Sequence, residues 1–189
     1  YVTGLGVVSG IGLGVAENIA SLRKHQHGMG KVTLFPTELD VPVSEIKYSN
    51  EELKRLLSLD IQKTFSRTAL LGMLAAREAV DDARLDLNTL RVGLISSTSV
   101  GGMDLSEHFY NAFKKDNRKG RLREVISHDC GASTEMIADY LKVNDFVTTI
   151  STACSSAANA IMLGARMIRN GQLDAAIVGG TDALCKFTL

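Results

Sequence analysis

The sequence lacks the paired cysteines that a disulfide framework or a cysteine zinc site needs. It contains only three cysteines, Cys130, Cys154 and Cys185, and no Cys-x-x-Cys pair. An odd number of isolated thiols disfavours both kinds of site, and His25 and His27 have no third ligand near them in the sequence. Free thiols are typical of a reducing compartment, so we expect a cytoplasmic protein without a metal.

An excess of charge of either sign is also lacking. Lys and Arg number 21 and Asp and Glu number 21, so the formal net charge is zero. No global basic field therefore favours nucleic acid as a partner. One basic run covers residues 114–123, but no aromatic residue interleaves with it, and a solvated loop is its first interpretation.

Long apolar runs are absent as well. No stretch of about eighteen apolar residues occurs, so we expect no membrane-spanning helix. No basic segment followed by an apolar one opens the chain, so we expect no secretory signal. With 45% hydrophobic and 22% charged residues, the composition is that of a globular domain, or of part of a larger one.

Strand-like and helix-like patterns alternate along the chain. Strands are predicted over Val2–Val8, Val92–Ile95, Phe146–Ser151 and Ala175–Val178. Helices are predicted over Val15–Leu22, from Glu51, and over Thr64–Ala83, Asp104–Lys115, Ser133–Leu141 and Ala153–Ile168. This alternation predicts an α/β fold with a mixed or mainly parallel sheet covered by helices.

The helix predicted from Ala153 is apolar around nearly its whole circumference. A helix of this kind is buried on all sides. In a single three-layer domain, helices are covered on one face only. We therefore expect a second layer over this helix, and that layer need not belong to this chain.

The segment Ile150–Ala158 passes from a β-branched strand through small residues into this helix. Such a turn places Cys154 at a helix N-terminus, where backbone N–H groups favour the thiolate and can hold a developing oxyanion. Cys154 therefore has the surroundings that a nucleophilic thiol needs. The alternative is an inert buried cysteine, the common fate of a free thiol.

Five segments together resemble the β-ketoacyl-acyl carrier protein synthases of the thiolase superfamily. In the family's order they are Val2–Ser9 in the first strand, Ala75–Ala79 in the first long helix, Ser97–Gly102 in a glycine turn, Thr152–Ser156 in the active-site elbow, and Ala176–Ala183 in a later strand. The resemblance covers nearly the whole chain. It implies a thiolase-like α/β fold with a mixed sheet and helices on both faces, forming one half of an αβαβα layered structure.

The resemblance also implies an activity, the decarboxylative Claisen condensation of fatty acid or polyketide synthesis. Cys154 would take an acyl group from a phosphopantetheine thioester, and malonyl-acyl carrier protein would lose carbon dioxide and attack that group. Val100 would line the acyl pocket, and Lys63 and Arg67 would contact the acidic carrier protein. No dissociable cofactor is implied, because the carrier protein brings its phosphopantetheine. The strand from Phe146 would pair across a homodimer axis.

One departure from the family is large. The family takes two catalytic histidines and a lysine from its second half, after the nucleophile. All histidines of this chain precede Cys154, and they are His25, His27, His108 and His128. The sequence stops at Leu189, about halfway along a family chain. We therefore expect residues 1–189 to form the amino-terminal half-domain, without the carboxy-terminal half, and to be incomplete for the whole condensation.

A short-chain dehydrogenase is one alternative. Ser97, Tyr110 and Lys114 reproduce the spacing of that family's catalytic Ser and Tyr-x-x-x-Lys, which act with NAD(P). The glycine fingerprint does not fit, because Gly10 and Gly12 lie two positions too late for Thr-Gly-x-x-x-Gly-x-Gly. The nucleotide-binding part of this hypothesis is therefore weak.

A non-catalytic partner subunit of a condensing enzyme is the other alternative. Some polyketide systems pair a synthase with a look-alike that has lost its nucleophile. Cys154 is present, so the chain differs from such a subunit in that respect. If the histidines and lysine of the family were missing, the chain would still act only by binding a partner, without catalysing the condensation.

Overall fold

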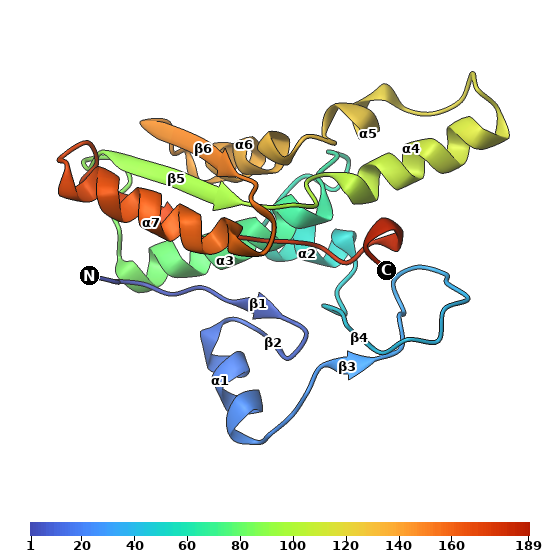
Figure 1. The fold of residues 1–189 in the computed structure, drawn as a ribbon, viewed down its shortest axis with the longest axis horizontal. Coiled ribbons are helices and arrows are strands. Elements are labelled where there is room, and N and C mark those ends of the chain that lie inside the picture. Colours follow the sequence, from blue (N-terminus) through green and yellow to red (C-terminus); the bar gives the residue numbers. More distant parts are fainter.

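The computed structural model describes residues 1–189, and its centre is a sheet of three parallel strands (Figure 1). The strand order is β6 (Phe146–Ile150), β5 (Val92–Ser97), β7 (Ala175–Val178). Helix α7 (Ser156–Arg169) packs on one face of the sheet, and α3 (Arg67–Ala83) and α6 (Cys130–Leu141) pack on the other. The predicted α/β fold with helices on both faces of the sheet is therefore confirmed.

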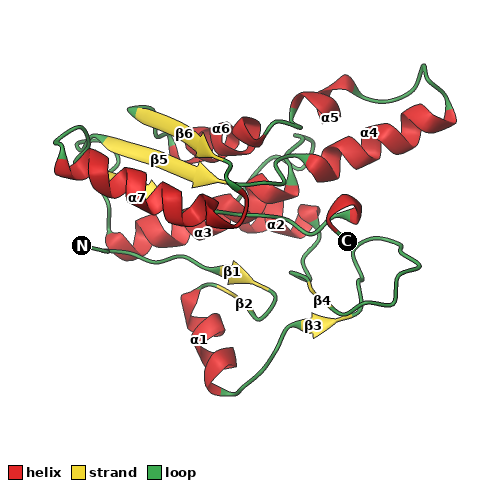
Figure 2. Cartoon of the chain, in the orientation of Figure 1, coloured by secondary structure: helices red, strands yellow, loops and turns green.

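Smaller elements surround this sheet (Figure 2). Two short antiparallel pairs join β1 (Val8–Ser9) to β2 (Gly12–Leu13) and β3 (Met29–Gly30) to β4 (Val43–Ser44). The remaining helical elements are α1 (Val15–Arg23), α2 (Asn50–Leu56), α4 (Met103–Lys115), α5 (Leu122–Ile126), and the 3-10 turns η1 (Ala153–Ser155) and η2 (Lys186–Thr188). None of the helices combines the length and apolar character that crossing a membrane requires.

Strand β5 is buried along its whole length, and its first four residues, Val92–Ile95, carry no polar side chain. Side chains alternate between the two faces of a strand. Leu94 accordingly joins the larger core cluster, with Leu70 and Met73 of α3. Ile95 points to the other face and joins the cluster beneath α7. The central strand thus connects both helical layers.

The strand predicted over Val2–Val8 is wrong for most of its length, because β1 contains only two residues. No neighbouring strand pairs with residues 1–7, and the segment lies against α3 instead. The backbone N–H of Val7 donates to the Glu78 carboxylate at 2.9 Å. A Cβ atom at Gly6 would overlap the Ala75 carbonyl oxygen, so this close approach requires glycine.

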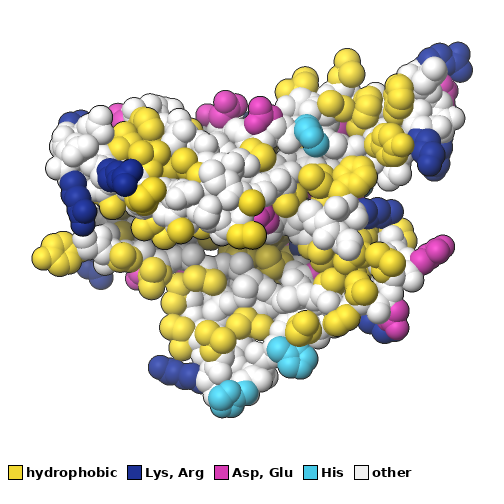
Figure 3. Space-filling view, viewed as in Figure 1, with side chains coloured by type: hydrophobic (Ala, Val, Ile, Leu, Met, Phe, Trp, Pro, Cys, Tyr) yellow, Lys and Arg dark blue, Asp and Glu magenta, His cyan; other side chains and the backbone are white.

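Helix α7 is buried on its inner face only. Ala160, at 0% exposure, and Gly164 face the sheet, and a Cβ atom at Gly164 would lie 2.6 Å from a Val178 methyl group. On the outer face Ile161 is 55% exposed and Met162 is 44% exposed. Apolar side chains are visible on this side of the molecule (Figure 3). The chain therefore leaves uncovered the face that the sequence predicts to be buried, and apolar surface of this kind marks an interface.

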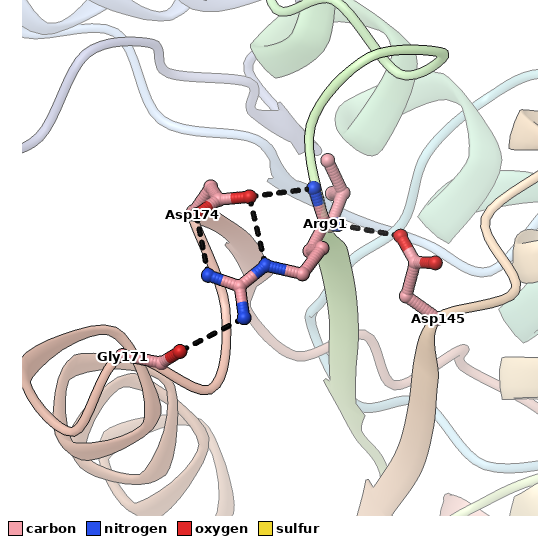
Figure 4. Close-up of polar contacts among 5 residues, drawn as sticks. Arg91, Asp145, Gly171 and Asp174 are labelled. Atoms are coloured by element: carbon pink, nitrogen blue, oxygen red, sulfur yellow. Dashed lines mark hydrogen bonds and ion pairs between the residues drawn. The ribbon is translucent and has the colours of Figure 1, made fainter.

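An ion pair ties the amino ends of β5 and β7 together (Figure 4). The Arg91 guanidinium donates to the Asp174 carboxylate from Nη2 at 2.7 Å and from Nε at 3.0 Å. The backbone N–H of Arg91 donates to the same carboxylate at 2.9 Å. Beside it, Asp145 accepts the N–H of Val92, which joins β6 to the same corner. The hydrogen bonds from the side chain and backbone of Arg91 lower the pKa of Asp174 to about 2.

Asp174→Asn is expected to lower stability at neutral pH and to lose this effect in acid. A depressed carboxyl pKa stabilises the fold above the ordinary Asp pKa of about 4, and the contribution disappears as the pH falls towards about 2. The urea midpoints of wild type and variant should therefore differ at neutral pH and converge in acid. The exposed Asp139→Asn serves as the control. A difference that stays constant across this range would contradict the assignment.

Candidate active site

Cys154 lies in the turn that joins β6 to α7. The strand ends at Ile150, the helix begins at Ser156, and the 3-10 turn η1 lies between them. Ala153 has a φ of 53°, a left-handed conformation that is uncommon for a residue with a side chain. The reversal of the chain leaves Cys154 exposed at the start of the helix. The strand-turn-helix arrangement predicted from the sequence is present.

Side-chain hydrogen bonds close this elbow from within. The Ser156 hydroxyl donates to the Ala153 carbonyl at 2.7 Å and accepts the N–H of Thr152 at 2.8 Å. Ser156 is only 5% exposed, so water does not compete with these bonds. One turn further along α7, the Asn159 amide donates to the Thr152 hydroxyl at 2.9 Å. The left-handed residue before Cys154 is therefore held from both sides.

The elbow shares the carboxyl edge of the sheet with a glycine turn, residues 98–102, which follows β5. The N–H of Thr98 donates to the Ile150 carbonyl at 3.3 Å, which connects the turn to the end of β6. The Ser97 hydroxyl donates to the Gly179 carbonyl just after β7 at 3.0 Å. Sites in α/β proteins form where the carboxyl ends of parallel strands meet. Cys154 lies at such a place.

Val100, the predicted substrate-binding residue, and Lys63, a predicted carrier-protein contact, lie in different loops. Val100 lies in the glycine turn and is half-buried, so it shares the sheet edge with the elbow. Lys63 is exposed in the loop before α3. Both positions are compatible with the predicted roles, which stay predictions.

The predicted carrier-protein contact of Arg67 conflicts with its position. Arg67 is only 7% exposed. Its guanidinium donates to the carbonyl oxygens of Tyr48 at 2.8 Å and of Ile46, and to the Asn50 side chain at 2.9 Å. Burial lowers the pKa of Arg67. This side chain fastens the segment before α2 to α3 and presents no charge to a partner at the surface.

The dehydrogenase alternative is not supported. Ser97 is 2% exposed, and its hydroxyl is engaged with the Gly179 carbonyl. Tyr110 is 52% exposed and Lys114 is exposed, both on α4. The spacing of these residues in the sequence therefore does not produce an enclosed catalytic set.

The remaining thiols and histidines lie apart from the elbow. Cys130 is half-buried at the start of α6 and Cys185 is buried. Burial, followed by a hydrogen bond with Glu107, raises the pKa of the Cys185 thiol. No histidine forms a hydrogen bond with the elbow, and no three His, Cys, Asp or Glu side chains gather as a metal centre. Cys154 is thus the exposed thiol of the chain.

Sequence reasoning missed the groups that support the site. Only Ser156 and Asn159 could have been found from the sequence, because they are polar residues at the start of an otherwise apolar helix. Thr98 and Asp182 hydrogen-bond at 2.7 Å although they lie far apart in the chain, and no spacing rule connects them.

Comparison with known proteins identifies the family. The family described as "Beta-ketoacyl synthase, N-terminal domain" matches residues 1–188. The 3-oxoacyl-[acyl-carrier-protein] synthase 2 of Staphylococcus aureus is 29% identical over 191 residues, which cover 96% of this chain and 46% of that protein. The chain therefore spans about half the length of the curated relatives it matches.

Solved structures share the fold. The ishigamide ketosynthase/chain length factor superposes with a TM-score of 0.89 and 29% identity, covering 99% of this chain and 48% of that one. A type II polyketide ketosynthase in complex with its acyl-carrier protein superposes with a TM-score of 0.76 and 22% identity, covering 99% and 46%. The predicted thiolase-like architecture is confirmed by these ketosynthases. Residues 1–189 belong to the β-ketoacyl synthase family and form its amino-terminal domain.

Proposed function

We propose that the protein containing this domain catalyses a decarboxylative Claisen condensation, with Cys154 as the nucleophile that carries the acyl group. The observation that supports this role is an exposed thiol, placed by a left-handed turn at the start of α7 and at the carboxyl edge of the sheet. Membership of the family supports the class of reaction. The pathway is fatty acid or polyketide synthesis.

The first step is acylation of the thiol. The Cys154 sulfur attacks the carbonyl carbon of an acyl-phosphopantetheine thioester, a new C–S bond forms, and the thiol proton passes to the departing pantetheine sulfur. The backbone N–H of Cys154 lies at the positive end of α7 and can donate to the oxyanion that develops on the carbonyl. A second donor comes from outside residues 1–189.

The second step is the condensation. Malonyl-acyl carrier protein loses its carboxyl group as carbon dioxide, and the resulting enolate carbon attacks the acyl carbon. A C–C bond forms and the C–S bond to Cys154 breaks, which returns the thiolate. In the family, two histidines and a lysine of the second half assist this step. We propose that a carboxy-terminal half-domain supplies them here and covers the apolar outer face of α7.

The partner that delivers both substrates is an acyl carrier protein. Lys63 is exposed, and α4 and α5 project from the sheet as an arm (Figure 1) whose tip carries basic side chains (Figure 3). The exposed basic residues of this tip are Lys114, Lys115, Arg118, Lys119, Arg121 and Arg123. An acidic carrier protein is complementary to such a surface. It brings phosphopantetheine with it, so the enzyme needs no dissociable cofactor.

A second subunit fits one of the two free edges of the sheet. Strand β6 is an edge strand, and its Val147 is 37% exposed. Unpaired backbone groups of an edge strand bind another strand readily. We propose a homodimer in the cytoplasm. The solved ketosynthase/chain length factor supports a second candidate partner, a related chain.

Covalent labelling tests the proposal. The full-length gene product is exposed to cerulenin, a covalent inhibitor of this family's nucleophile, and analysed by intact mass spectrometry and peptide mapping. A single adduct on Cys154 is expected, because Cys130 is half-buried and Cys185 is buried. No adduct on Cys154, or equal labelling of the three thiols, would show that Cys154 is an ordinary cysteine.

A further inference from the structure

Two side chains from distant parts of the chain hold the glycine turn in one conformation. Asp182 follows β7, and its Oδ1 accepts hydrogen bonds from the Thr98 hydroxyl at 2.7 Å, the N–H of Ser99 at 2.9 Å and the N–H of Val100 at 3.2 Å. The Thr98 oxygen accepts in turn from the N–H of Val100 at 3.1 Å and of Gly101 at 3.0 Å. Three successive N–H groups of the turn are thus satisfied by two side chains.

The other contacts of this turn hold its glycine end. The carbonyl of Val100 accepts the N–H of Met103 at 3.3 Å, and Gly101 and Gly102 are buried against residues 127–130. Residues 98–102 belong to no strand or helix. Gly101 has a φ of 56°, and Gly102 precedes α4 without a side-chain cap. The flanking backbone bonds are long, at 3.3 Å from Thr98 to Ile150 and 3.4 Å from Gly102 to the carbonyl of residue 128. Thr98 is 3% exposed, so water cannot replace its hydroxyl without rearrangement.

We propose that Asp182 and Thr98 are positioning residues that set the acyl-chain preference of the enzyme by fixing Val100. This inference rests on the proposed function and on the role that the family resemblance implies for Val100, as a residue that lines the acyl pocket. The N–H of Val100 is the one group that both side chains hold directly. A displaced valine changes the room for the acyl chain, and in an apolar pocket room for one methylene group is worth roughly tenfold or more in selectivity.

Four variants of the full-length gene product test the inference. Asp182→Ala and Thr98→Val remove the hydrogen bonds, whereas Asp182→Asn keeps an acceptor oxygen and Thr98→Ser keeps the hydroxyl. Acylation of Cys154 is followed by intact mass spectrometry with acyl-phosphopantetheine thioesters of short, medium and long chains. We expect the ratio of long-chain to short-chain rates to change about tenfold in the first two variants. The ratio should stay near the wild-type value in the two conservative ones.

The outcomes separate the possible failures. Equal slowing at every chain length, with the ratio unchanged, would mean that Asp182 and Thr98 only stabilise the fold, and it would overturn the inference alone. A wild-type protein that no thioester acylates at Cys154 would overturn the proposed function itself. Asp182 is exposed, so its alanine variant is expected to fold, and Thr98→Val preserves side-chain volume as a second probe. Circular dichroism verifies the fold of each variant.

Discussion

Cys154→Ala is expected to abolish transfer of an acyl group to the protein while leaving the fold unchanged. The thiol is exposed and forms no hydrogen bond, and the elbow is closed by Thr152, Ser156 and Asn159 instead. Loss of the nucleophile of a covalent catalyst lowers kcat by a factor on the order of 10⁶. Intact mass spectrometry of the full-length gene product, incubated with an acyl-phosphopantetheine thioester, measures the effect.

The matched control for this variant is Cys130→Ala. Cys130 is half-buried at the start of α6, so its removal should leave acylation at the wild-type rate. An acyl adduct that survives in Cys154→Ala would place the nucleophile elsewhere. Loss of the adduct in Cys130→Ala would implicate that thiol. Equal melting temperatures of wild type and the two variants would show that a difference in acylation rate comes from loss of the thiol and not from unfolding.

The second large effect is expected at Ala153, the residue before the nucleophile. At a φ of 53° a β-branched side chain is strongly disfavoured. Ala153→Val should therefore force the turn out of its left-handed conformation and displace the thiol. A displacement of about 1 Å can slow a reaction by roughly 100-fold. Acylation rates measured by mass spectrometry should show a loss of this size.

Ala153→Gly separates conformation from side-chain contacts. Glycine adopts positive φ without the penalty of a Cβ atom, so this variant should keep the elbow and the wild-type acylation rate. Thermal melts identify any variant that has lost its global fold. If the valine variant reacted as fast as wild type, the left-handed turn would have no part in presenting Cys154.

The layers of the fold could be predicted because their signals are local. Strand β5 was visible as an apolar run and α3 as a helical repeat, and both exist at nearly the predicted bounds. Helix α3 begins at Arg67 and not at Thr64, because the Ser66 hydroxyl accepts the N–H of Ala69 and caps it. The elbow could be predicted for the same reason, since strand, small residues and helix follow one another directly.

Long-range features could not be predicted in this way. Residues 2–7 have a strand-like composition, but strand formation needs a neighbour, and the Glu78 carboxylate satisfies the N–H of Val7 instead. The burial of Arg67 depends on the segment around Tyr48 folding back onto α3. The five-residue α5 is too short to show a periodic pattern. The path of residues 2–7 and the burial of Arg67 thus depend on contacts between distant parts of the chain, which only the complete fold brings together.

The central position of β5 constrains the order in which the protein can fold during synthesis. Both partners of this strand come later in the chain, since Gly93 pairs with Phe146 on one side and with Ala176 on the other. Pairing over such separations is slow, because a long loop must close before any contact stabilises it. Leu70 and Met73 of α3, fully buried in the native state, leave the ribosome well before the sheet that covers them. The nascent chain therefore passes through an interval in which chaperones have apolar surface to bind.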